Sequence, residues 1–244
     1  MLRLISSLVF GVLTVNTYAQ IQSVDVTGGG NGIGGANVKI NNALGQTPSS
    51  AVNYDEVRGR YFWDENWKPA RLLMRNGGLV NLTRVKLNLF TNEIHYIGDT
   101  GSELVAQKGL VKELVFATSL IDTTVTGRFK SLSGLTRDFK ENYFQVLNRG
   151  SYELLKLTSI TLYKGDYDAM LGRRDFKFVS AVRYYLANGD NRILELKSLN
   201  REALFSIIER TEQSEEYLKK NKNKLKNESD VVEFLVWLNS EAKK

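Results

Sequence analysis

The sequence predicts an α+β fold that is mainly β, in which an antiparallel, hairpin-connected sheet is followed by two or three C-terminal helices. Between Tyr61 and Lys197, short segments alternate apolar with polar residues and are separated by turn signals, which is typical of antiparallel strands. After Lys197 the apolar period lengthens to that of helices. Strands first and helices last is the order of an α+β fold.

Residues 1–19 are predicted to be an export signal. One cation, Arg3, precedes an apolar run from Leu4 to Val15, and small residues end the segment at Ala19. The run is shorter than the roughly 20 apolar residues that span a bilayer, and it resembles the apolar region of a cleavable signal. We therefore expect cleavage after Ala19, no transmembrane span in the mature chain, and a periplasmic or outer-membrane-associated location.

Residues 20–53 are expected to form a flexible arm rich in glycine, asparagine and serine, ahead of an antiparallel β domain at 54–197. Gly30, Gly32 and Gly35 satisfy the spacing of a dinucleotide-binding loop. That loop binds phosphate only where a strand turns directly into a helix, and the residues after Gly35 lack a helical pattern. The glycines therefore indicate a tether, and no cofactor is expected.

Three turns within the β domain are predicted to join hairpins. Asn76-Gly77 and Asn188-Gly189 each lie between two strand-like segments, and this dipeptide tolerates the positive φ that a tight hairpin turn requires. A longer loop over residues 148–150 also contains a glycine. These turns predict that consecutive strands pair with each other.

Two strands have informative patterns. The strand from Val80 changes parity near Thr83 and Arg84, which predicts a β-bulge or a switch of face. Between Phe176 and Leu186, mostly apolar residues occupy alternate positions, which predicts a half-buried strand.

Segment 198–244 is predicted to be helical and to pack on the sheet. Asn200 can cap a first helix whose last turn holds Arg210. Residues 215–220 contain two Glu-to-Lys pairs at i,i+4 spacing, which predict a second helix, and Asn227 or Ser229 starts a third. In the third helix, the apolar residues share one face: Val231, Phe234, Leu235 and Leu238, widened by Trp237.

Composition limits the chemistry. The 244 residues carry a formal charge of +6, with no cysteine and one histidine. The lack of cysteine excludes disulfides, thiol catalysis and cysteine metal ligands. In an exported protein, mild positive charge fits anionic lipid headgroups, an envelope polysaccharide or an acidic partner better than nucleic acid, and scattered positive charge can equally serve solubility alone.

Several segments occur together: YFWDENWKPARLLMRNGG from Tyr61, VKLNLFTNEIHY from Val85, ENYFQVLNRGSYELLK from Glu141, VRYYLANGDN from Val182, and lysine-rich C-terminal helices. In this combination the chain resembles an uncharacterised family of exported proteins common in Bacteroidota. The resemblance implies an envelope location and a strand-rich domain with lysine-rich C-terminal helices. It implies no reaction, ligand or functional residue.

Other residues that could carry chemistry have simpler explanations. A metal site around His95 would need several carboxylates, so we expect a polar position on the face of the sheet opposite Ile94. Asp166 and Asp168 are spaced as paired carboxylates, but the next residues do not continue a calcium loop, which indicates an ordinary loop. Asp122-Thr123-Thr124 matches a short acceptor pattern for O-linked glycans.

We therefore expect a non-enzymatic, exported envelope protein that acts as an accessory or interaction module, for example as a periplasmic subunit of an outer-membrane assembly. No catalytic, cofactor-binding or metal-binding residue is predicted. Its expected partner is another envelope protein, and its lysines could also contact an anionic lipid or glycan surface or form a solvated linker. The candidate contact residues are Trp63, Trp67, Lys220, Lys222, Lys224 and Lys226.

The alternative is a carbohydrate-binding or carbohydrate-active envelope protein. Its aromatic platform would be Trp63 and Trp67, because aromatic rings stack on sugars. Nearby acids would accept hydrogen bonds from sugar hydroxyls: Asp55, Asp64 and Glu65. Tryptophans four residues apart in a strand-rich region can equally be core or interface anchors.

Overall fold

The computed structural model describes residues 45–46, 57–119, 121–122, 124–133, 139, 142–168, 170, 173–189 and 192–241. These residues belong to one compact unit, Ile40–Lys244. The predicted signal at 1–19 and most of the predicted arm at 20–53 lie outside the described residues.

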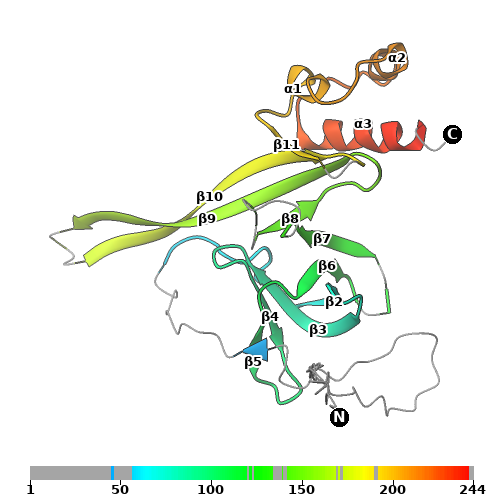
Figure 1. Ribbon diagram of the computed structural model, residues 1–244. Helices are drawn as coiled ribbons and strands as arrows, with labels where there is room; N and C mark the ends of the chain where they lie inside the picture. Colours follow the sequence, from blue (N-terminus) through cyan, green and yellow to red (C-terminus); the bar gives the residue numbers. More distant parts are fainter. Residues whose placement is uncertain are drawn as a thin grey trace, which may run out of the picture. The chain divides into compact units, whose positions relative to one another are not determined.

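Within the described residues, eleven strands form one antiparallel sheet and three helices follow (Figure 1), which confirms the predicted fold class. The strands are β1 (Gly45–Gln46), β2 (Lys68–Met74), β3 (Leu79–Asn88), β4 (Glu93–Ile97), β5 (Glu103–Ala106), β6 (Val111–Ala117), β7 (Val125–Ser131), β8 (Tyr143–Val146), β9 (Glu153–Asp168), β10 (Arg173–Ala187) and β11 (Ile193–Leu196). The helices are α1 (Arg201–Phe205), α2 (Glu212–Lys220) and α3 (Glu228–Glu241).

The spatial order of the strands is β1-β5-β4-β3-β2-β6-β7-β8-β9-β10-β11. Most neighbours in the sheet are also neighbours in sequence, as hairpin connections require. The two exceptions are β6, which pairs with β2, and β1, which pairs with β5. Although β1 lies in the range expected to be a flexible arm, its two residues are bonded to the edge of the sheet.

The three predicted hairpins are all present, with different turns. Gly77 has a φ of +87°, and its N–H donates to the carbonyl of Met74 at 3.0 Å, so only glycine fits well there. Gly189 is not at positive φ. Its turn is closed instead by Asn188, whose N–H donates to the carbonyl of Arg192 and whose Oδ1 accepts from the Arg192 N–H.

The predicted irregularity in β3 is a β-bulge. Ala70 pairs with Leu82 and Lys68 pairs with Val85, so β3 contains one more residue than β2 between these pairs. The extra residue lets Leu82 and Val85, which differ in parity, both pack with the core, where Val85 is fully buried.

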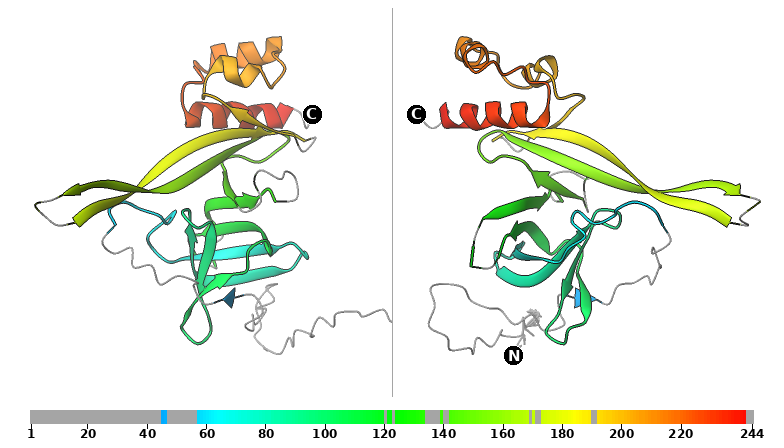
Figure 2. Two further views of the ribbon diagram at one scale, coloured as in Figure 1. Left: turned by 60° about the vertical axis from the view of Figure 1, so that its left-hand side comes forward. Right: turned by 180° about the vertical axis from the view of Figure 1, so that it is seen from behind.

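Strands β9 and β10 are much longer than their neighbours. β8 pairs only with residues 155–156 of β9, and β11 only with residues 184–187 of β10, so the rest of this ribbon extends past them (Figure 2). Residues 179–183 are exposed on both faces, so the prediction of a half-buried strand holds only toward its ends.

β9 also continues to Asp168. The prediction of a loop around Asp166 and Asp168 is therefore wrong, because cross-strand pairing with β10 persists through this segment.

The core has three parts. One is formed by strands β2–β7 with Tyr143 of β8. A second lies between the C-terminal helices and the paired ends of β9 and β10, which are the start of β9 and the end of β10. A third lies on the opposite face of these paired ends. The second contains Leu154, Leu186 and Leu196 from the sheet, with Phe234 and Leu235 from α3. Figure 2 shows α3 against the sheet and α1 and α2 beyond it.

The helix signals are confirmed in most respects. Asn200 caps α1 by accepting a hydrogen bond from the Ala203 N–H, and Asn227 caps α3 by accepting from the Asp230 N–H. The first helix is shorter than expected because α1 ends at Phe205. Arg210, expected in its last turn, instead pairs with Glu215 of α2.

Asn239 fixes α3 to the turn between β8 and β9. Its side chain is buried, accepts a hydrogen bond from the Tyr152 N–H at 2.8 Å, and donates to the carbonyls of Tyr152 and Arg149. The turn passes so close that a Cβ on Gly150 would lie 2.3 Å from the Asn239 Cγ. One amide therefore bonds three backbone groups of the turn, and it shares the Tyr152 carbonyl with the side chain of Asn148.

We predict that Asn239→Ala lowers the free energy of unfolding by about 1–3 kcal/mol, because the Tyr152 N–H and the Arg149 carbonyl lose the buried amide that bonds them. Ser240→Ala is the matched control, since its exposed hydroxyl bonds only within α3, and it should change stability by less than about 0.5 kcal/mol. Urea denaturation measures both. Equal effects would contradict the proposed role of Asn239.

Glu228 connects the start of α3 to the sheet. Its carboxylate accepts hydrogen bonds from Lys156 Nζ at 2.8 Å and Tyr184 Oη at 2.7 Å. Burial alone would raise the pKa of Glu228, but these two hydrogen bonds outweigh it and lower the net pKa. Burial, together with the bond to Glu228, raises the pKa of Tyr184 to about 12.

Because its pKa is lowered on folding, Glu228 stabilises the fold above the ordinary glutamate pKa, and this contribution is lost as the pH falls through the lowered value. Glu228→Gln should therefore be less stable than the wild type at pH 7, by up to about 1 kcal/mol after solvent screening. The difference should shrink below about pH 4. Denaturation at pH 7, 5 and 3 tests this, and a difference independent of pH would contradict it.

Candidate functional site

The lysine-rich segment between α2 and α3 is the strongest candidate for a contact surface. Residues 219–226 contain five lysines, all exposed: Lys219, Lys220, Lys222, Lys224 and Lys226. Among the residues that the structure describes, none of these ammonium groups has an ion-pair partner. The four lysines named by the sequence analysis thus lie together.

This basic loop, residues 221–227, has a defined backbone. α2 ends at Lys220 with Asn221 as its C-cap, and Lys222 follows in the left-handed region with a φ of 53°. The Asn223 N–H donates to the Leu218 carbonyl at 3.0 Å and the Lys222 N–H to the Lys219 carbonyl at 3.3 Å, which is the Schellman pattern. Glycine usually takes the position that Lys222 occupies here.

Leu225 anchors the loop from below. It also has a left-handed backbone, with a φ of 49°, and its side chain is fully buried with Leu218 and Val231 in the core beneath the helices. Asn223 holds the backbone on either side by accepting from the Leu225 N–H at 2.9 Å and donating to the Asp230 carbonyl at 2.8 Å. Sequence reasoning missed both residues, although one leucine among alternating lysines was a signal of such an anchor.

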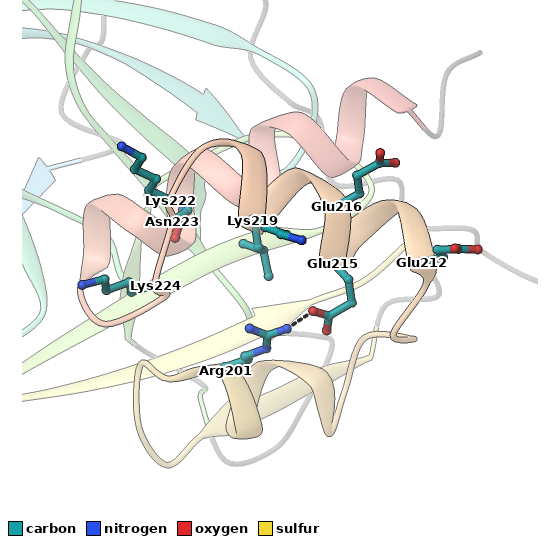
Figure 3. A pocket seen from close by; sticks show the side chains of 9 residues that line it. Arg201, Glu212, Glu215, Glu216, Lys219, Lys222, Asn223 and Lys224 are labelled. Atoms are coloured by element: carbon teal, nitrogen blue, oxygen red, sulfur yellow. Dashed lines mark hydrogen bonds and ion pairs between the residues drawn. The ribbon is translucent and has the colours of Figure 1, made fainter.

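The loop borders an open hollow beside α2. Figure 3 shows Lys222 and Lys224 pointing away from the carboxylates of Glu212 and Glu216, which line the same hollow. Glu215 lies deeper and pairs with Arg201 of α1 and with Arg210. Lys222 and Lys224 therefore point away from these acids of α2 and remain available to an external anion.

The two candidate tryptophans lie elsewhere and are used structurally. Trp63 packs in the core, with its ring stacked at 4.8 Å on Phe116, and a Cβ on Gly127 would come within 2.4 Å of it. Trp67 lies against Lys86, whose ammonium group is 4.8 Å from its ring centre. The structure does not bring these rings together with the lysines of the basic loop.

Of the acids expected beside the tryptophans, the structure describes Asp64 and Glu65. Asp64 accepts from the Asn66 N–H and pairs with Lys68, and the first of these contacts is the main cause of its lowered pKa. Glu65 is exposed, and Asp55 lies outside the described residues. Trp63 therefore serves the core rather than a stacking platform.

His95 lies on the expected face of β4, but that face is covered. The side chain is buried, Nδ1 lies 2.6 Å from Glu103 Oε1, and the ring of Phe62 packs edge-on at 5.5 Å. Nε2 lies 3.8 Å from Glu93. Within the described residues there is no group of three or more potential ligands placed to hold a metal.

The possible glycan acceptor lies in the turn before β7. Asp122 accepts from the N–H and hydroxyl of Thr124, and these hydrogen bonds lower the pKa of its carboxyl. Thr123 lies outside the described residues. In the described part of the chain, no helix is long and apolar enough to cross a bilayer.

Comparison of the chain with protein-family models, with curated proteins and with solved structures gives no match. The resemblance to the exported Bacteroidota family therefore stays a prediction, and the function must be argued from the residues themselves.

We predict that Lys222→Gly stabilises the protein by about 0.5–1 kcal/mol. A left-handed conformation costs a lysine roughly 1–2 kcal/mol and glycine little, and the greater entropy of unfolded glycine offsets part of this gain. Lys224→Gly is the control, because Lys224 has no positive φ, and it should be neutral or destabilising. Thermal unfolding separates the two. A destabilised Lys222→Gly would show that the lysine itself maintains the loop.

Proposed function

We propose that this protein is a non-enzymatic, exported component of the cell envelope that acts as an accessory or interaction module, with the basic loop as part of its contact surface. One observation carries the proposal: the loop holds its lysines outward, without ion-pair partners among the described residues, on a backbone fixed by a buried leucine. A fixed arrangement of unneutralised charge favours association with an anionic partner.

The exported location rests on the sequence of residues 1–19. A periplasmic subunit of an outer-membrane assembly is the specific role that we favour, with another envelope protein as the partner. The carbohydrate alternative loses its main support, because Trp63 is packed against Phe116 and Gly127.

Affinity isolation from solubilised envelopes tests this proposal. A C-terminally tagged full chain should be recovered in the envelope fraction without residues 1–19, together with one reproducible protein partner in near-stoichiometric amount. Mass spectrometry of the purified chain locates the new N-terminus. Recovery of the uncleaved chain from the cytosol, or of no partner above an untagged control, would contradict the proposal.

A further inference from the structure

We infer that the basic loop attaches the protein to the surface of an anionic lipid bilayer. This inference rests on the proposed function only for the location of the protein in the envelope. The five lysines of residues 219–226 lie within a short stretch of chain and are all exposed. Charges separated by less than a Debye length, about 8–10 Å in physiological salt, act on an opposing surface together. Clusters of four to eight cations are typical of segments that adsorb to anionic lipids.

The kind of cation favours a bilayer over a specific protein surface. All five are lysines, which attract phosphate groups as point charges without the planar, two-point geometry by which arginine recognises a carboxylate. The lysines spread from the last turn of α2 along the loop, and Lys222 and Lys224 point away from the carboxylates of Glu212 and Glu216 (Figure 3). An extended anionic surface fits this arrangement better than a single bound anion.

The fixed backbone strengthens the attraction. A flexible lysine segment loses conformational freedom when it adsorbs, whereas this loop is already held by Leu225, Asn223 and the Schellman turn at Lys222. Two residues other than glycine adopt left-handed conformations here, a kind of strain that tends to occur at functional sites.

The residues beside the loop suit the interface of a bilayer but not deep insertion. Lys220 lines a shallow hollow with Tyr217 and Trp237, whose rings stack at 4.2 Å, and such rings are favoured at the level of the headgroups. Glu216 and Glu241 line the same hollow, and carboxylates oppose entry into hydrocarbon. The attachment is therefore electrostatic, reversible and sensitive to salt.

Co-sedimentation with vesicles tests the inference. The purified protein should bind vesicles that contain about one-third phosphatidylglycerol in phosphatidylcholine, and it should bind pure phosphatidylcholine weakly. Each lysine near an anionic surface contributes roughly a factor of five, so the triple variant K222Q/K224Q/K226Q should bind about a hundred-fold more weakly. Raising the salt to 0.5 M should also release the wild type.

The double variant K112Q/K197Q is the control, because these two lysines are exposed elsewhere on the protein, and it should bind nearly as the wild type does. Circular dichroism confirms that the variants are folded. Equal binding by the triple and control variants, binding to neutral vesicles as strong as to anionic ones, or binding of soluble polyphosphate without vesicle binding would overturn the inference. If the envelope partner is still retrieved in those cases, the proposed function stands and only the bilayer attachment fails.

Discussion

The C-terminal third of the protein depends on the packing of α3 against the start of β9 and the end of β10, which are paired with each other. Phe234 and Leu235 are fully buried there with Leu154 and Leu186, and each such side chain contributes about 1.5–3 kcal/mol by leaving water. The chain has no cysteine, so no disulfide assists. Asn239 adds specificity, because its amide fits only one position of α3 over the turn at Gly150.

The basic loop is coupled to this packing. Leu225 belongs to the same buried cluster as α3, and burying a leucine offsets the roughly 1–2 kcal/mol that its left-handed backbone costs. The positions of Lys222, Lys224 and Lys226 are thus set by contacts beneath the loop. A change in the docking of α3 would move the lysines even where no lysine is altered, so the surface and the core must be considered as one structure.

Local signals in the sequence were sufficient for much of the fold. Gly77, the parity change at Thr83 and the caps Asn200 and Asn227 each act within a few residues of their own position, so a reader of the sequence can identify them. Features that depend on distant partners could not be predicted. Trp63 could not be distinguished from an exposed platform without knowing that Phe116 and Gly127 lie beneath it. For the same reason the exposure of residues 179–183 on both faces was missed, because alternation does not reveal whether anything covers a strand.

Several cations elsewhere in the protein are used differently from those of the basic loop. Arg128 pairs with Glu113, Arg201 with Glu215, and Lys130 with Glu153, so each of these cations joins two elements of the fold. The two acids that follow the loop are engaged with other groups. Glu228 accepts from Lys156 and Tyr184, and Asp230 Oδ2 accepts from the backbone N–H of Lys226 at 3.0 Å. An acid that orders the backbone fixes the loop without neutralising it. Exposed like charges repel each other, so this ordered cluster of lysines does not itself stabilise the fold, which is consistent with the proposed contact with an anionic surface.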